Sequence, residues 1–198
     1  MRDQLDQKVI KSRDIHFLPE YEIGVISQTT TPYEFRLIDE NYPIKEIYAA
    51  ASLSGRQMAK VAQEQVNLLR SENKIIRYWA LIGLRSHDLR MLAPHRSEIL
   101  AMTEDAYPPN SILAATISYQ FFRDQGSQEI LKSYCQDKNM ELALMAINQL
   151  LYIDNKSPFI KVVQAVYQME NRNYKVKAAC LDFLGILKLV PNDFEHKD

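Results

Sequence analysis

A recurring three-residue frame constrains the fold of this chain more than any other feature. Each copy has a small residue at its fifth position and a core-type residue at its ninth. The copies are Ile76, Ala80 and Leu84; Ser111, Ala115 and Tyr119; Leu142, Ala146 and Leu150; Val176, Cys180 and Leu184. Successive copies start roughly 33 residues apart, which is a typical length for a two-helix repeat.

Small residues at one position of a helix let successive helix pairs approach closely enough to pack. The frame therefore predicts an all-α, right-handed α-solenoid of two-helix repeats, because each pair buries its face only against its neighbours. Since any amphipathic helix yields similar spacings, a generic helical bundle is the alternative.

Helix-type patterns run from Pro43 nearly to the end of the chain. Five glycines in 198 residues also favour helices over folds that need many tight turns. A first helix follows Pro43 and ends at Gly55, and a second runs over about 56–70. Further helices are predicted over about 74–86, 94–104, 110–123, 126–136, 139–152, 157–170 and 173–188.

The segment before Pro43 has a different pattern. Residues 1–13 are of helix-forming composition, whereas prolines, threonines and a glycine interrupt residues 14–42. We predict a linker-like segment 1–42, with a short helix and an extended, irregular arm, followed by a repeat domain 43–198. The aromatic side chains of the arm should pack on the following helices or on a neighbouring domain; they are Phe17, Tyr21, Tyr33, Phe35 and Tyr42.

Motifs for catalysis, metal binding or cofactor binding are not recognisable in the sequence. The four histidines are scattered, and there is no Cys-x-x-Cys pair, phosphate-binding glycine loop or nucleophile elbow. We therefore predict no catalytic, metal or cofactor site and no enzymatic activity for this chain. Cys135 and Cys180 are expected to be small core residues, although one disulfide between them stays open.

One basic region is a candidate anion-binding patch. Between residues 70 and 96, six basic residues stand against Glu72 and Asp88. The six are Arg70, Lys74, Arg77, Arg85, Arg90 and Arg96. A patch of this kind would suit a sulphated glycan or an acidic protein surface. The alternative, which we favour, is a solvated helix face in which Arg77 is locally paired.

Several stretches resemble the C-terminal end of bacterial sulfatases of the arylsulfatase or heparan N-sulfatase type. Asp14-Ile15-His16-Phe17-Leu18-Pro19-Glu20 resembles the linker that leaves their catalytic region. Tyr42-Pro43 with the following 47–51 resembles the helix that opens their helical extension. The stretch 76–84 is similar to the first HEAT-like repeat of that extension, and 142–150 to a later one.

This resemblance implies a non-catalytic HEAT-like accessory domain of a sulfatase. It would support the catalytic domain, the substrate cleft or subunit contacts, and its compartment would be periplasmic or extracellular. The sulfatase nucleophile motif, Cys-x-Pro-x-Arg, fits neither Cys135 nor Cys180, so no catalytic or calcium-binding residue carries over. The partner would then be the catalytic domain of the same protein.

Two other functional classes compete with the accessory domain. The first is a free-standing HEAT-repeat scaffold that binds a protein or peptide. The second is a HEAT-like DNA glycosylase, which should be basic in order to hold a phosphate backbone. A net charge of −1 argues against nucleic acid as a partner. The N-terminal residues show no signal-peptide core, and no run of apolar residues is long enough to span a membrane.

Overall fold

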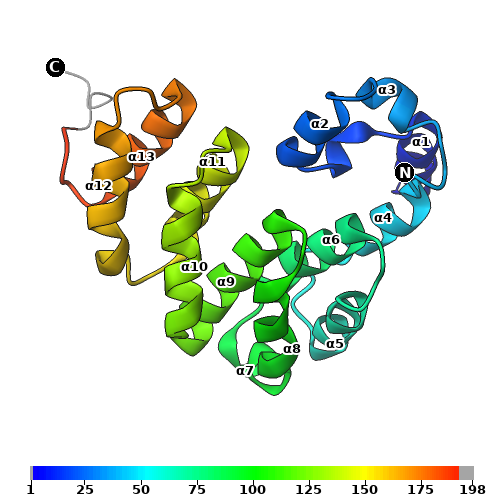
Figure 1. Ribbon diagram of the computed structural model, residues 1–198. Helices are drawn as coiled ribbons and strands as arrows, with labels where there is room; N and C mark the ends of the chain where they lie inside the picture. Colours follow the sequence, from blue (N-terminus) through cyan, green and yellow to red (C-terminus); the bar gives the residue numbers. More distant parts are fainter. Residues whose placement is uncertain (1, 192–198) are drawn as a thin grey trace, which may run out of the picture. The chain divides into compact units, whose positions relative to one another are not determined.

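The computed structural model describes residues 2–191, and this part of the chain is all-helical, without strands. It divides into two compact units, of which the first ends at Leu113 and the second begins at Ala114. The helices of the first unit are α1 (Arg2–Ser12), α2 (Glu20–Ile26), α3 (Pro32–Phe35), α4 (Ile44–Ala51), α5 (Ala59–Leu68), α6 (Lys74–Leu84), α7 (Leu89–Leu92) and α8 (Arg96–Ala101) (Figure 1). Helix α9 (Pro108–Phe122) spans the boundary, and the second unit continues with α10 (Gln125–Cys135), α11 (Met140–Gln149), α12 (Ile160–Gln168) and α13 (Tyr174–Ile186). The prediction of an all-α fold is confirmed.

Asparagine N-caps begin three of the helices that carry the recurring frame. The side-chain oxygens of Asn73, Asn139 and Asn173 accept hydrogen bonds from the backbone two residues later, at 2.9, 2.9 and 2.8 Å. Each asparagine stands three residues before the start of a frame. A capping side chain satisfies a backbone N–H that the first helical turn leaves unpaired. Helices α6, α11 and α13 therefore begin at equivalent points of the frame.

Residues of the frame occupy the cores of the two units. Ala80, Ala115, Ala146 and Cys180, at the small position, are all fully buried. The residues four positions later are also buried, with exposures of 2% or less; they are Leu84, Tyr119, Leu150 and Leu184. Ile76 is the one frame residue that is only partly buried. The small residues thus lie where helices meet, as the sequence predicted.

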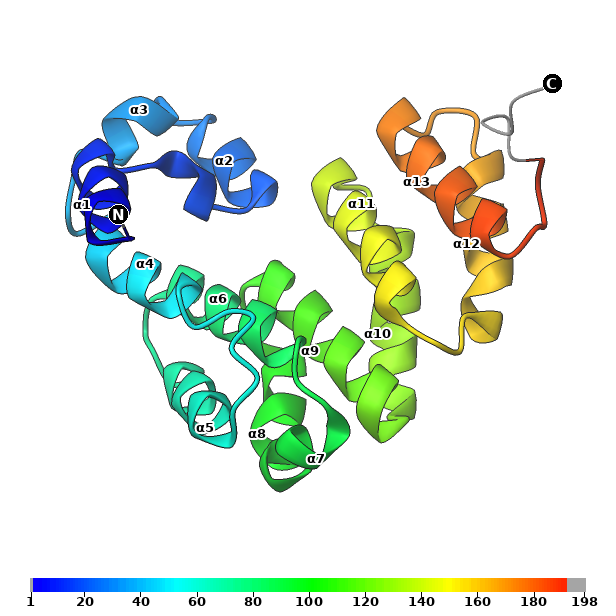
Figure 2. The same cartoon turned by 180° about the vertical axis from the view of Figure 1, so that it is seen from behind.

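Alternate helices pack on one another within each unit. In the first unit α6 contacts both α4 and α5, and α5 contacts α7. In the second unit α10 contacts α11 and α12, while α13 contacts α11 and α12 (Figure 2). The two successive helix pairs α10–α11 and α12–α13 therefore stack so that α10 packs on α12 and α11 packs on α13.

The N-terminal segment is helical and folded, so the prediction of an extended arm over 14–42 is wrong. Pro19 is the N-cap of α2, and Pro32 lies in the first turn of α3. Proline is tolerated at these positions because the first backbone N–H groups of a helix have no partner inside it. Thr31 and Glu34 form a reciprocal capping box at the start of α3. The interruptions in the sequence thus mark helix starts.

This segment packs on α4 and α6 of its own unit. Tyr42 is fully buried in a cluster with Leu18, Ile44, Ile47 and Ile75. Partly buried aromatic side chains surround this cluster; they are Phe17, Tyr21, Phe35, Tyr48 and Trp79. These aromatic side chains of the segment therefore pack on the helices that follow it, which is the first of the two predicted alternatives.

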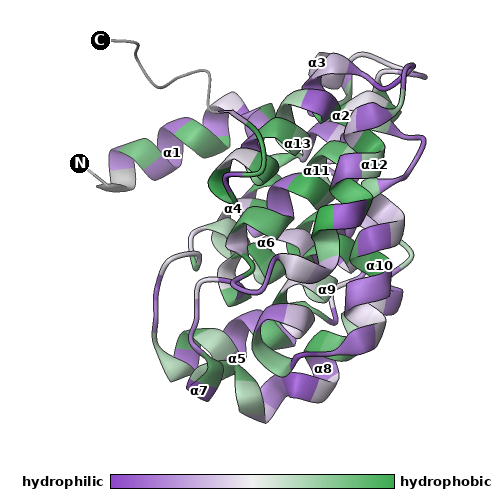
Figure 3. Cartoon of the chain, turned by 90° about the vertical axis from the view of Figure 1, so that its left-hand side faces the viewer, coloured by the Kyte–Doolittle hydropathy of each residue, from purple (hydrophilic) through white to green (hydrophobic). Residues whose placement is uncertain are grey.

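Tyr33 is the exception among the predicted aromatic anchors, because it is 61% exposed. Its ring lies under the Arg36 guanidinium at 4.7 Å instead of in the cluster. Helix α1 shows hydrophobic and hydrophilic bands in turn (Figure 3), but the apolar side chain of Leu5 is exposed. Ile10, by contrast, packs against the cluster.

Candidate functional site

The six basic residues of the predicted anion-binding patch do not share one environment. Lys74 and Arg77, both on α6, are each held by a carboxylate that is 5% exposed. Lys74 Nζ lies 2.8 Å from Glu22 of α2, and Arg77 Nε lies 2.6 Å from Asp105. Their positive charge is therefore largely neutralised inside the first unit.

Arg77 and Asp105 form a bidentate ion pair. Besides the 2.6 Å contact, Arg77 Nη2 donates to the other carboxylate oxygen at 3.0 Å. Burial alone would raise the pKa of Asp105, but hydrogen bonds from Arg77, the Tyr107 backbone and Asn110 outweigh it and lower the pKa. Arg77 also donates to the backbone oxygens of residues 71 and 72. Arg77 is thus locally paired, as the alternative to a binding patch requires.

The remaining four basic residues lie on separate elements. Arg70 follows α5, Arg85 is the C-cap of α6, Arg90 is on α7 and Arg96 begins α8. Glu98 lies among them: a Ser97 hydrogen bond, and further the charges of His95 and Arg70, lower its pKa. Anion binding by these residues stays a prediction.

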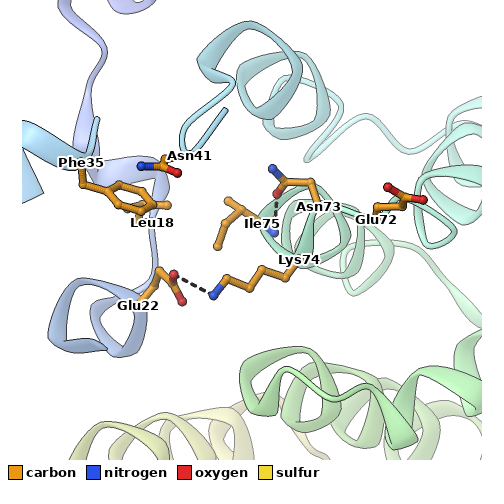
Figure 4. Close-up of a pocket in the computed structure, with 8 residues that line it drawn as sticks. All are labelled: Leu18, Glu22, Phe35, Asn41, Glu72, Asn73, Lys74 and Ile75. Carbon is orange, nitrogen blue, oxygen red and sulfur yellow. Dashed lines mark hydrogen bonds and ion pairs between the residues drawn. The ribbon is translucent and has the colours of Figure 1, made fainter. Parts of the chain in front are cut away.

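A cavity of about 240 Å³ lies between α2 and α6 (Figure 4). Leu18, Phe35 and Ile75 supply apolar walls, and polar side chains supply the rest; they are Glu22, Asn41, Glu72, Asn73 and Lys74. In the close-up, Glu22 and Lys74 point toward each other across the cavity. The ion pair joins a helix of the N-terminal segment to the first frame helix.

The Glu22 carboxylate acts electrostatically on Tyr107, and each of these residues has a buried polar atom. Glu22 Oε2 and the Tyr107 hydroxyl are both buried with no hydrogen-bond partner within ordinary distance. Burial, and next the neighbouring Glu22 carboxylate, raise the pKa of Tyr107 well above its usual value. The Lys74 ammonium lies 4.9 Å from the centre of the Tyr107 ring. Glu22 therefore fixes the packing of α2, and its charge is already balanced.

A groove of about 300 Å³ lies along α4, α5 and the start of α6. Its floor is formed by small and apolar side chains, namely Ala49, Ala50, Leu53, Leu68 and Ile76, with Ser71. Glu46 of α4 and Glu64 of α5 stand at its walls, and both are exposed. Neither carboxylate has an ion pair or hydrogen bond among the contacts of residues 2–191. Sequence analysis missed this site because the two glutamates belong to no motif and stand on different helices.

Next to the groove, a buried polar network connects α5 with the loops that follow α4 and α6. Gln65 is fully buried, and its Nε2 donates to Leu53 O at 3.1 Å. Its Oε1 accepts from His87 Nε2 at 2.8 Å, which fixes the ring with its proton on Nε2. Burial lowers the pKa of His87 although the Asp88 carboxylate opposes this. His87 is therefore a neutral structural histidine at pH 7.

Cys135 and Cys180 are buried free thiols in the second unit. Burial raises the pKa of Cys135 to about 12 and that of Cys180 to about 11. Both are therefore protonated near neutral pH, and they pack as small core residues, as the sequence predicted.

Comparisons with known proteins do not add a relative. No family model, no curated protein and no solved structure matches this chain. The sulfatase resemblance therefore stays a prediction that rests on the stretches quoted above. In the described part of the chain, no helix has the length and apolarity needed to cross a bilayer. Residues 2–191 also contain no cluster of three or more His, Cys, Asp or Glu side chains that could hold a metal ion.

Proposed function

We propose that this chain is a non-catalytic helical-repeat scaffold, and that the groove along α4 and α5 binds a segment of another protein. The repeat character is supported by the equivalent asparagine caps of α6, α11 and α13 and by the fully buried small residues. Stacking of the pairs α10–α11 and α12–α13 also supports a solenoid of HEAT-like pairs. Such folds bind partners along the surfaces that successive helices create.

The observation that carries the binding proposal is the combination of an apolar floor with two unpaired carboxylates. An apolar side chain that enters the groove loses its contact with water, which is worth about 1.5–3 kcal/mol for a leucine or phenylalanine. Glu46 and Glu64 flank that position from two different helices. They favour a partner segment in which lysine or arginine stands on both sides of the apolar residue.

The two contributions differ in their response to salt. Exposed ion pairs contribute only about 0.2–1 kcal/mol each and weaken as salt rises. The apolar contact is not weakened in this way. We therefore expect modest affinity, a moderate loss of affinity with added salt, and a clear preference for basic over acidic segments.

The test is a fluorescence anisotropy titration of the whole chain with two labelled helical peptides. The first has leucines on one face flanked by lysines, and the second has glutamates in place of the lysines. We expect the lysine peptide to bind at least about tenfold more tightly, which corresponds to about 1.4 kcal/mol. Glu46→Lys with Glu64→Lys should abolish this preference. Equal affinities for the two peptides would refute the proposal.

A control variant changes one acidic residue away from the groove. Glu129 pairs with Lys132 on α10, and Glu129→Lys leaves the groove unchanged. This variant should keep the preference for the lysine peptide. If it loses the preference as the groove variant does, then peptide binding depends on overall charge and the groove is not the site.

A further inference from the structure

Helix α13 has an outer face that nothing in the described residues covers. Its inner face is buried against α11 and α12; the buried residues are Val176, Ala179, Cys180, Phe183 and Leu184. On the opposite side, Tyr174, Ala178, Leu181 and Gly185 follow one another at alternating intervals of four and three. Tyr174 is 75% exposed and Leu181 39% exposed, while a Cβ added at Gly185 would meet no atom within 4 Å.

The spacing of this outer stripe is that of a helix–helix contact. Residues at alternating intervals of three and four form one continuous seam along a helix, and such a seam packs on a partner helix. The face of a helix that meets only water is usually lined by polar and charged side chains. The middle of this face of α13 is apolar or small, which indicates that it contacts another helix.

We propose that α13 packs antiparallel against α13 of a second copy of this chain, about a two-fold axis between Ala178 and Leu181. In that arrangement, the numbers of two residues that face each other, one from each copy, always have the same sum. Leu181 then faces Ala178 of the second copy, and Tyr174 faces Gly185. Each bulky side chain meets a small residue or a bare backbone, so the seam is complementary to itself.

Charges beside the seam are also complementary to themselves. Lys175 and Asp182 lie on the same flank of the stripe, and both are exposed without an ion pair among the described contacts. In the antiparallel pair, Lys175 of one copy lies within about 3 Å, along the helix axis, of Asp182 in the other, because a helix rises about 1.5 Å per residue. The two-fold axis repeats this pair, so the contact gains two ion pairs. Flanking charges of this kind set orientation and partner choice in helix pairs.

The contact is small, so the dimer should be weak. One pair of 13-residue helices buries less than the roughly 1,600 Å² of a standard interface. We therefore expect a dissociation constant between about 10 μM and about 1 mM.

Sedimentation equilibrium of the whole chain from about 10 μM to about 1 mM tests the proposal over the range in which such dimers form. The wild type should shift from monomer to dimer. Leu181→Asp should be monomeric throughout, with an unchanged melting temperature at low concentration, because Leu181 does not support the core. A wild type that stays monomeric over the whole range would overturn the proposal and leave this face to a different partner.

Reversal of the charges tests the antiparallel register itself. Asp182→Lys opposes a lysine to Lys175 of the second copy, twice, and should weaken the dimer by about tenfold. The double variant Lys175→Asp with Asp182→Lys restores opposite charges and should recover wild-type association. If the double variant is as weak as Asp182→Lys alone, this pairing of the two helices is wrong. The far-UV circular dichroism spectrum and melting temperature of each variant show separately whether its fold is intact.

Discussion

Gly83→Ala should destabilise the protein, although alanine is the better helix former. Gly83 is buried near the end of α6, opposite Gln65 of α5. A Cβ at Gly83 would lie 2.7 Å from Gln65 Cδ and closer still to its Nε2. These distances are shorter than the van der Waals radii of the atoms allow. The Gln65 amide would have to move away, and with it the hydrogen bonds to Leu53 and His87.

The expected magnitude follows from the groups that lose their partners. Loss of two buried hydrogen bonds costs about 1–2 kcal/mol each when a polar group is left unsatisfied. Replacing glycine by alanine inside a helix returns about 1 kcal/mol. The free energy of unfolding should therefore fall by about 1–3 kcal/mol.

Urea denaturation followed by far-UV circular dichroism measures this change in the free energy of unfolding. Two further variants serve as controls. Gly24 is exposed on α2 with no atom near its missing Cβ, so Gly24→Ala should stabilise by about 0.5–1 kcal/mol. In a Gln65→Ala background the obstacle is gone, and Gly83→Ala should no longer destabilise. If Gly83→Ala stabilises the wild type as much as Gly24→Ala does, the described network is not formed.

Further expectations concern pH, an ion pair and the thiols. Because burial lowers the pKa of His87 in the folded state, the unfolded state binds the proton more readily; stability should fall as pH drops below about 6.5, and His87→Gln should remove this part of a pH series of melting curves. Arg77→Met leaves the Asp105 carboxylate buried without its partner and should cost about 3 kcal/mol in a denaturation experiment, whereas exposed Arg90→Met should change little. Cys135 and Cys180 should react with a thiol reagent at pH 8 only after denaturation; two rapidly reacting thiols in the folded protein would contradict their burial.

Helix positions could be predicted from the sequence because their signals are local. Helices were predicted to begin at about residues 74, 139 and 173, and they begin at 74, 140 and 174, each capped by the asparagine before it. A cap acts on backbone groups two or three residues away, so the sequence alone contains the whole interaction. The same locality explains the error at Pro19 and Pro32, since a proline inside a helix and one at its start look alike in composition.

The sequence by itself determined the helical class, the places where α6, α11 and α13 begin and the small residues buried in the cores. Tertiary structure alone decided which charges are neutralised, because Lys74 meets Glu22 and Arg77 meets Asp105 only after distant helices pack. It also brought Glu46 and Glu64 to one groove and left the outer face of α13 uncovered. Caps and helical periodicity act over a few residues along the chain, whereas pairing and exposure depend on which segments fold against each other.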